Sequence, residues 1–332
     1  MRFTTRIDAE TFDELLRPKL RLFLSVDIVG STSFKHQQTK EPGPRWVFSF
    51  LSFYQSFHQI LDTAVLPAKP ARSKRIASSV NLPLLWKALG DELIFVVELR
   101  QRHEAAHYLC AFRRALQETQ SNWYQSAERM QFKGTAWLAG FPLGNVEVPF
   151  DEMPDRKAPL PDFIGPQIDA GFRLKEHATP RKIVLSADLA YLLVKAGSPG
   201  MDLFFDGDQS LKGILHGKPY PLIWLDGDVR NGASKTPSLQ QHKDKLLGRK
   251  RATPKLLSCY LEAWLTESRA EVPKPFIATD PFGDLRPPHD YAQRLNAWKA
   301  TMRSNFLFLE KPDEKDKGLR HLPKSVLRLL DL

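Results

Sequence analysis

The sequence has few cysteines and no long apolar run. Only Cys110 and Cys259 occur among its 332 residues, so a disulfide scaffold is excluded and a reducing compartment fits best. The most apolar stretch, residues 46–66, is interrupted by Ser, Gln, His and Asp, and no run reaches the roughly 18 apolar residues that a membrane span needs. The N-terminus has no apolar core of a signal peptide. We therefore expect a soluble, cytoplasmic protein.

Acidic residues are outnumbered by basic ones, and the net charge of +10 favours anionic partners such as nucleotides or nucleic acid. The basic residues gather at 72–75 and again at 243–255. Neither cluster is interleaved with aromatic residues or carries a nucleic-acid-binding motif. We interpret both as solvated surfaces and do not expect nucleic acid to be the partner.

The order of apolar patterns predicts an α+β fold. Residues 21–148 read as β-α-β-β-α-β, which is the ferredoxin-like arrangement, and further helices and strands follow as far as residue 226. Within this region we expect hairpins at 82–99 and 132–148, and a helix at 164–177. The predicted organisation is an N-terminal helical segment at 1–19, a main domain with an antiparallel-rich sheet flanked by helices at 20–226, a linker at 227–252, and a helical extension at 253–332 with helices at about 253–268, 288–304 and 322–331.

An aspartate lies near the end of the first long apolar strand. Asp27 follows a run in which nearly every residue is apolar, as in strands that are covered on both faces. A carboxylate in such a place costs several kcal/mol unless it is paired or bound to a metal. Gly30, Ser31 and Thr32 then end the strand with small residues. Asp27 is therefore a candidate ligand.

A second aspartate repeats this pattern in the hairpin WKALGDELIF. Asp91 lies at a tight turn between two apolar strands. If these strands neighbour the first one, Asp27 and Asp91 project to the same point, where two carboxylates repel each other unless a cation lies between them. Hard cations such as Mg²⁺ choose oxygen ligands and leave positions open for phosphates. The alternative is that both are ordinary turn aspartates.

Two later segments add polar candidates. In DFIGPQIDAGFRL, Asp169 and Arg173 are four residues apart and share a helix face. They form either a surface ion pair or a group that reaches a polyphosphate. Lys212 begins a turn in SLKGIL and is either a plain turn residue or a phosphate ligand.

These motifs together resemble those of the class III nucleotidyl cyclases over about residues 20–226. The matching segments are D-I-x-G-x-T at 27–32, K-x-x-G-D at 87–91, the run from Asp162 through Gly165, Ile168 and Asp169 to Arg173, and L-K-G at 211–213. Residues 134–148 match the glycine-containing hairpin of the family more loosely. Each motif alone is weak, but their order and their places on the predicted elements agree with the family.

The resemblance implies a two-metal mechanism. Asp27, Asp91 and the backbone carbonyl of Ile28 would bind two Mg²⁺ or Mn²⁺ ions, and the ribose 3′-oxygen would attack the α-phosphorus in line. Arg173 would stabilise the α-phosphate, and Lys212 would bind the outer phosphates.

The resemblance also implies how substrate and partner chain are placed. Gly30, Ser31 and Thr32 would form a loop that lets the triphosphate approach the backbone. Lys87 and Asp162 would read the base. The family forms its sites between two chains, so a homodimer is expected.

The base is predicted from departures within the motifs. Asp169 stands where most members of the family have a catalytic asparagine, and Ile164 replaces a bulky aromatic residue. The predicted helix at 44–66 is crowded with aromatic residues, some of which could narrow the base pocket. This combination resembles the bacterial pyrimidine cyclases of anti-phage Pycsar signalling. It implies conversion of UTP to cyclic UMP, ahead of cyclic CMP, with the product sensed by a separate effector.

Three alternatives stay open at the level of sequence. Lys87 and Asp162 also fit an ordinary adenylate cyclase. The basic charge also fits a non-catalytic ferredoxin-like protein that binds nucleotides or nucleic acid. Asp169 also fits a catalytically inactive cyclase that only senses nucleotide.

Overall fold

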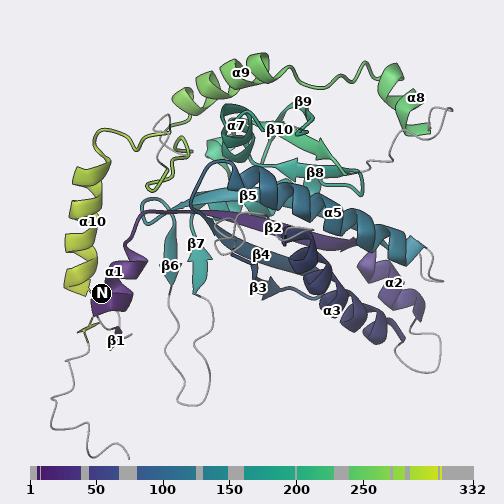
Figure 1. Cartoon of the computed structure of the whole chain (residues 1–332), viewed down its shortest axis with the longest axis horizontal. Coiled ribbons are helices and arrows are strands. Elements are labelled where there is room, and N and C mark those ends of the chain that lie inside the picture. The colour runs from purple at the N-terminus through teal and green to yellow at the C-terminus, as the bar shows by residue number, and fades with distance from the viewer. Residues whose placement is uncertain are drawn as a thin grey trace, which may run out of the picture.

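The computed structural model describes most of the chain, and Figure 1 shows how its elements are arranged. The described residues are 6–7, 9–38, 45–66, 81–124, 130–148, 161–198, 200–227, 239–269, 272–280, 285–305 and 307–308. None of the helices among these residues is long and apolar enough to cross a membrane.

A seven-stranded sheet forms the centre of the molecule, with the order β3-β4-β2-β5-β8-β10-β9. Its strands are β2 (Lys19–Val29), β3 (Leu84–Ala88), β4 (Glu92–Leu99), β5 (Gln131–Phe141), β8 (Lys182–Leu185), β9 (Leu203–Ser210) and β10 (Pro219–Asp226). Among the described strands of this sheet, β5 and β8 run parallel and the other neighbours run antiparallel. The predicted α+β fold is confirmed.

The first half of the sheet has the predicted ferredoxin-like topology. The chain runs β2-α3-β3-β4-α5-β5, with α3 at Arg45–Val65 and α5 at Glu104–Tyr124. In space, β2 lies between β4 and β5, and β3 lies outside β4. This arrangement brings the end of β2 next to the turn between β3 and β4.

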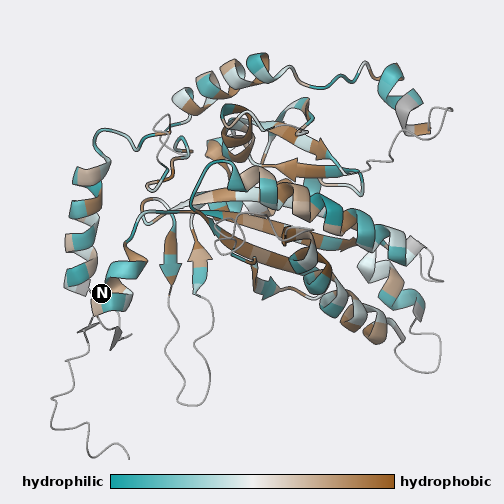
Figure 2. Cartoon of the chain, in the orientation of Figure 1, coloured by the Kyte–Doolittle hydropathy of each residue, from teal (hydrophilic) through white to brown (hydrophobic). Residues whose placement is uncertain are grey.

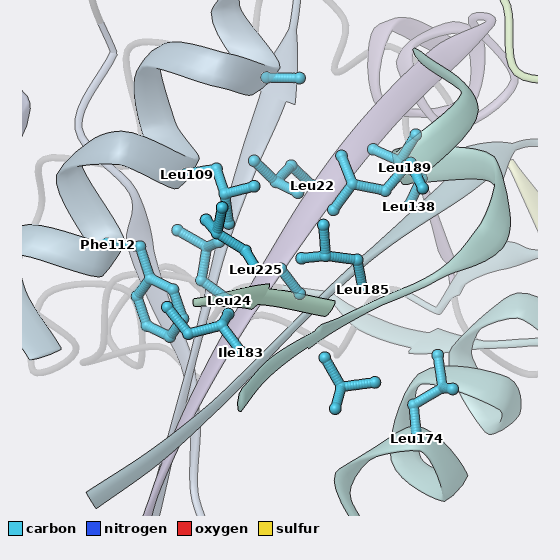
Figure 3. Packing of buried hydrophobic residues seen from close by; sticks show 14 of the residues in the cluster. Leu22, Leu24, Leu109, Phe112, Leu138, Leu174, Ile183, Leu185, Leu189 and Leu225 are labelled. Atoms are coloured by element: carbon cyan, nitrogen blue, oxygen red, sulfur yellow. The ribbon is translucent and has the colours of Figure 1, made fainter. Parts of the chain in front are cut away.

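One face of the sheet carries the main hydrophobic core. Alternate residues of β2, such as Leu22 and Leu24, point to this face, where α3, α5 and α7 (Ala187–Lys195) cover them. Figure 3 shows Leu109 and Phe112 of α5 packed against these strand residues. Helix α3 forms because Phe50, Phe53, Phe57 and Leu61 recur every three or four residues and are all buried. Figure 2 shows hydrophobic residues concentrated on the strands of the sheet.

The other face carries a smaller aromatic cluster. Phe23 of β2 stacks on Trp137 of β5 with ring centroids 5.3 Å apart, and Phe163 meets Phe23 edge-on. Helix α6 (Pro166–Leu174) packs here through Ile168 and Phe172. Because side chains alternate along a strand, Ser25 and Asp27 lie on the same face as Phe23.

The C-terminal region wraps the main domain. Its helices are α8 (Leu239–Leu246), α9 (Pro254–Glu267) and α10 (Tyr291–Asn305). Helix α9 packs on α7 and buries Leu257, Leu261 and Leu265. Helix α10 lies beside α1 (Ala9–Leu15), where Trp298 packs against Phe12, and β1 (Arg6–Ile7) pairs with β11 (Leu307–Phe308).

Three local expectations are corrected. The segment 144–148 does not pair with β5, because β6 (Val146–Val148) forms a separate two-stranded sheet with β7 (Asp162–Ile164). Pro142 has no N–H to continue the hairpin, and Asn145 bonds to Gly140 and Gln167 instead. The second correction is that the residues 164–177 do not form one helix. They contain the end of β7, then α6, and then a short 3₁₀ turn, Lys175–His177.

The other correction concerns residues 30–32. Gly30 makes a turn with φ of 73°, and helix α2 (Ser31–Gln38) begins directly after it, so Ser31 and Thr32 belong to a helix and not to a loop.

Within the predicted linker, residues 239–246 form α8. The predicted helix at 322–331 lies outside the described residues.

Candidate active site

Asp27 lies near the end of β2 and faces two charged neighbours. In the sheet register it is opposite Glu92 of β4 and Lys133 of β5. The Lys133 Nζ lies 3.1 Å from Asp27 Oδ2, and both side chains are about one-quarter exposed. Burial raises the pKa of the Asp27 carboxyl above its usual value; Lys133 opposes this, while Asp91 and Glu92 add to it.

Asp91 is held beside Asp27 by the backbone. The Ile28 N–H donates to the Asp91 carbonyl at 3.0 Å, which ties the β3–β4 turn to the end of β2. The Ser31 hydroxyl, at the start of α2, donates to Asp91 Oδ2. Gly90, with φ of 75°, allows the tight turn, and the Tyr54 hydroxyl donates to its carbonyl at 2.5 Å. The structure thus brings together the two aspartates that the sequence singled out.

The donor set at this point suits a hard cation. Asp27 and Asp91 offer carboxylate oxygens and Ile28 a backbone carbonyl, which are the ligand types that Mg²⁺ and Mn²⁺ prefer. Among the side chains that the structure describes, Lys133 donates to Asp27 and Ser31 to Asp91, so each carboxylate keeps further lone pairs. Within the described part of the chain, no group of three or more His, Cys, Asp or Glu side chains is arranged to hold a metal. Asp27, Asp91 and the Ile28 carbonyl therefore fit divalent ions that take their remaining ligands from a substrate.

The predicted base-reading residues also meet. Lys87 of β3 and Asp162 of β7 form an ion pair with Nζ and Oδ1 2.8 Å apart, and both side chains are about one-third exposed. The Lys87 ammonium lies 4.5 Å from the Trp86 ring centre. Trp86 in turn contacts Phe163 and Phe172. A donor and an acceptor therefore lie side by side at the border of the aromatic cluster.

The aromatic residues of α3 are placed elsewhere. Phe50, Phe53 and Phe57 are buried in the main core on the opposite face of the sheet. Phe48 is 72% exposed. Tyr54 reaches the Gly90 turn beside Asp91 and not the Lys87–Asp162 pair.

Helix α6 presents its polar candidates to solvent. Asp169 and Arg173 are both exposed, and neither side chain makes a hydrogen bond or ion pair with another described residue. The helix is anchored at its N-terminus, where the Gln167 N–H donates to Asn145 Oδ1 at 3.1 Å and the Gln167 side chain donates to Asp188 Oδ2 at 2.6 Å. Arg173 lies on α6, and its side chain makes no ion pair with Asp27 or Asp91 of its own chain.

Lys212 is also exposed. It lies in the turn after β9, where Gly213 has φ of 76°. Leu211 and Ile214 on either side of this turn are buried and fix it to the domain. Gly30 and Thr32 are exposed next to Asp27 and Asp91, whereas Ser31 is buried.

Sequence reasoning missed a buried polar cluster beneath this surface. Glu92 is 5% exposed, accepts from the Ser25 hydroxyl at 2.5 Å, and pairs with Lys175 at 2.6 Å. It also missed Lys133. A sequence signal existed for Glu92, since a third acidic candidate directly follows Asp91 at the start of an apolar strand. Lys133 gave no such signal, because only the register places it opposite Asp27.

The comparisons with known proteins find similarity in structure alone. No family model matches the chain, and no curated protein matches it. The adenylyl cyclase CyaB from P. aeruginosa is 14% identical, with a TM-score of 0.46 over 66% of this chain and 98% of that one. The guanylyl cyclase Cya2 is 15% identical, with a TM-score of 0.44 over 65% and 96% of the two chains. The guanylate cyclase domain of RhGC from Catenaria anguillulae, in complex with GTP, is 9% identical, with a TM-score of 0.43 over 63% and 97%. Likeness at this level says nothing of the substrate or the activity.

Proposed function

We propose that the chain is a class III nucleotidyl cyclase, which converts a nucleoside triphosphate to a 3′,5′-cyclic nucleotide and pyrophosphate. The observation that carries this proposal is the meeting of Asp27 and Asp91 at the end of β2, on the side of the sheet that also carries Lys87 and Asp162. Two neighbouring carboxylates repel each other, and Lys133 pairs with Asp27 alone, so this arrangement costs folding stability. Their cost is explained if they bind metal ions and a triphosphate.

Each polar group has a task in this reaction. Asp27, Asp91 and the Ile28 carbonyl would hold two Mg²⁺ or Mn²⁺ ions, which when bound make the ribose 3′-hydroxyl more acidic and neutralise phosphate charge. Arg173 would stabilise the charge that develops at the α-phosphate, and Lys212 would bind the departing pyrophosphate.

The remaining site residues would position the substrate. Gly30 and Thr32 are exposed at the strand end and leave the backbone open to phosphates. Ser31 would hold Asp91 in its orientation through its hydroxyl. Asp169 would accept a hydrogen bond from a ribose hydroxyl in place of the asparagine that most of the family has.

Two chains would complete the site. The side chains of Asp169 and Arg173 are exposed and make no hydrogen bond or ion pair with the other described residues, so they could reach a second copy. In a symmetric homodimer, one protomer would supply Asp27 and Asp91 and its partner Arg173 and the Lys87–Asp162 pair. Because every part occurs once per chain, the dimer would have two sites.

For the base we propose a pyrimidine, with UTP ahead of CTP. The Lys87 ammonium can donate to the uracil O4, and the Asp162 carboxylate can accept from N3–H. The same pair can donate to adenine N1 and accept from its amino group, so adenylate cyclase activity is the second candidate. We expect the smaller ring to fit better, because the Trp86 ring, which lies against Lys87 and contacts Phe172, takes up space beside the pair. The product would then act as a messenger of anti-phage defence that a separate effector senses.

One experiment tests the chemistry and the base together. Purified protein is incubated with each of the four nucleoside triphosphates and Mn²⁺, and the products are identified by mass spectrometry, with Asp27→Ala as the inactive control. Cyclic UMP in excess supports the full proposal, and cyclic CMP in excess supports a pyrimidine cyclase. Cyclic AMP alone would overturn the pyrimidine assignment. No cyclic product from any triphosphate would overturn catalysis and favour a protein that only binds nucleotides.

A further inference from the structure

The basic cluster at 243–255 has no part in the proposed reaction, yet the structure gives three of its residues a defined place. Arg249, Lys250 and Arg251 line a cavity of about 1040 Å³ between the outer strands of the sheet and the start of α9. Figure 1 shows the chain between α8 and α9 passing over β9 and β10. The strand order places this cavity at the opposite edge of the sheet from the β3–β4 turn that holds Asp91.

The cavity carries an excess of positive charge. It is lined by His177 and by four side chains that carry a positive charge, Lys182, Arg249, Lys250 and Arg251, against one carboxylate, Asp206. Asp206 is shared, because Lys182 and Arg249 both pair with it, and Arg249 also pairs with Asp244. Arg251 pairs with Asp202 in an arrangement that leaves both side chains about half exposed or more. Lys250 is exposed and makes no ion pair among the described residues. An anion in the cavity would therefore meet Lys250 as a basic side chain without an ion pair among the described residues.

Apolar and aromatic side chains form the wall beside these charges. Phe205 of β9 and Tyr260 of α9 have ring centroids 5.1 Å apart, and Phe205 is 40% exposed. The Tyr260 hydroxyl donates to Asp208 Oδ1 at 2.6 Å, which holds the ring in place. Leu222 and Leu257 are buried behind them. A planar ring can therefore be buried or stacked here while a charged group stays at the basic rim.

The segment that carries the charges is held in place. Arg251 forms a β-bridge with Phe204, and the Ala252 N–H donates to the Leu203 carbonyl at 2.7 Å, so the segment lies along β9. Thr253 is the N-cap residue that precedes α9, and its side chain makes no capping hydrogen bond. The N-terminal N–H groups of this helix add positive potential at the same end of the cavity.

We propose that this cavity is a second ligand site, which binds a small molecule of the nucleotide class in which a phosphate group is joined to a planar ring. The phosphate lies against Lys250, Arg249 and Arg251, and the ring lies against Phe205 and Tyr260. A single pair of rings fits a mononucleotide better than a nucleic-acid strand, which needs successive stacking platforms along a basic groove. The proposal does not depend on the proposed cyclase activity.

The test is binding of AMP and UMP to the full chain, measured by isothermal titration calorimetry. The Lys250→Ala/Arg251→Ala variant should bind about tenfold more weakly than the wild type or not at all, because charge-assisted hydrogen bonds to phosphate are lost. The matched control is Lys243→Ala/Lys245→Ala, which removes the same charge from α8 outside the cavity and should leave the affinity unchanged. Lys87→Ala, in the proposed base site, should leave this binding event in place. Circular dichroism checks that each variant is folded.

Several outcomes would overturn the proposal. One is unchanged affinity in Lys250→Ala/Arg251→Ala, and another is loss of all binding in Lys87→Ala alone. If inorganic phosphate binds as tightly as AMP at equal ionic strength, the ring adds nothing and the assignment is wrong. If a 12-residue oligothymidylate binds much more tightly than either mononucleotide and the control variant weakens it equally, the basic segment is a nucleic-acid surface instead. Cyclase activity should be the same in both double variants, so failure of this proposal and failure of the proposed function remain distinguishable.

Discussion

The Lys133 ammonium lies 3.1 Å from the carboxylate of Asp27. The protein therefore supplies a cation of its own to one of the two residues proposed to bind metal. The negative charges of Asp91 and Glu92 lie close to Asp27, and they favour the binding of a cation beside its carboxylate. A divalent ion that binds Asp27 must displace Lys133 or share the carboxylate with it.

This competition predicts that Lys133→Met tightens the binding of Mn²⁺. Removing the ammonium removes both a competitor for Asp27 and a repulsive charge beside the ion, so we expect the dissociation constant to fall about tenfold, equivalent to about 1.4 kcal/mol. Calorimetric titration of Mn²⁺ without nucleotide measures it. Lys195→Met, which removes a surface lysine paired with Glu262, is the matched control. Weaker binding in Lys133→Met would show that Lys133 orders the carboxylate for the metal and does not compete with it.

A shared site predicts complementation between two inactive variants. Asp91→Ala removes a metal ligand and Arg173→Ala removes the side chain that reaches the α-phosphate, so each homodimer should be inactive. A mixed dimer has one site that carries both changes and one site that carries neither. Equal mixing should restore about one-quarter of the wild-type activity, since half the dimers are mixed and each has one intact site of two. No recovery despite subunit exchange, followed by native mass spectrometry, would place the whole site within one chain.

The buried pair of Glu92 and Lys175 predicts a strong asymmetry between single and double changes. Lys175→Met leaves the Glu92 carboxylate buried with the Ser25 hydroxyl as its one side-chain partner among the described residues, which should lower the free energy of unfolding by about 3 kcal/mol. Lys175→Met combined with Glu92→Gln removes the charge and should recover most of this loss. Urea unfolding measures both. Lys195→Met breaks an exposed pair and should cost less than about 1 kcal/mol. A double variant no more stable than Lys175→Met would refute the charge-burial explanation.

Helix α6 approaches the sheet so closely that a methyl group cannot fit. A Cβ on Gly171 would lie 2.3–2.5 Å from ring atoms of Trp137, which is itself buried. Alanine normally favours a helix over glycine, yet here we expect Gly171→Ala to lower the free energy of unfolding by about 1–3 kcal/mol, because the overpacking outweighs the propensity. Gly140→Ala is the control, since its Cβ would have 3.9 Å to the nearest atom. Equal stability of the two variants, measured by urea unfolding, would mean that α6 shifts to make room.

The sequence predicted those features that depend on local pattern. The apolar alternation of β2, the three- and four-residue spacing in α3, and the order of elements through β5 were sufficient for the ferredoxin-like topology. Asp27 and Asp91 could be paired in advance because that topology makes β2 and β4 neighbours.

What the sequence did not predict depends on register and on long-range packing. Lys133 meets Asp27 only because β5 aligns with β2 in one of its possible registers, and a shift by one residue would turn its side chain to the other face. Lys175, in the 3₁₀ turn after α6, pairs with Glu92 of β4, which lies 83 residues away along the chain. The pairing of β6 with β7 depends on Asn145 and Gln167, which meet only in the folded chain. None of these contacts produces a repeating pattern in the sequence from which it could be predicted.

Asp188, which helps anchor α6, predicts a dependence of stability on pH. It is fully buried, accepts from Gln167, Ser186 and the Leu189 N–H, and burial raises its pKa to about 6 from the usual 3.8. Because the folded state holds this proton more tightly than the unfolded state, the carboxyl stabilises the fold most at low pH, and the contribution is lost as pH rises through 6. Asp188→Asn mimics the protonated form and should not show this loss. We expect the variant to gain about 1 kcal/mol relative to the wild type between pH 5 and pH 7.5 in urea unfolding. Asp13→Asn, on the exposed side of α1, controls for the loss of one carboxylate. If Asp188→Asn differs from the wild type by the same free energy at both pH values, Asp188 is ionised at both and the prediction is wrong.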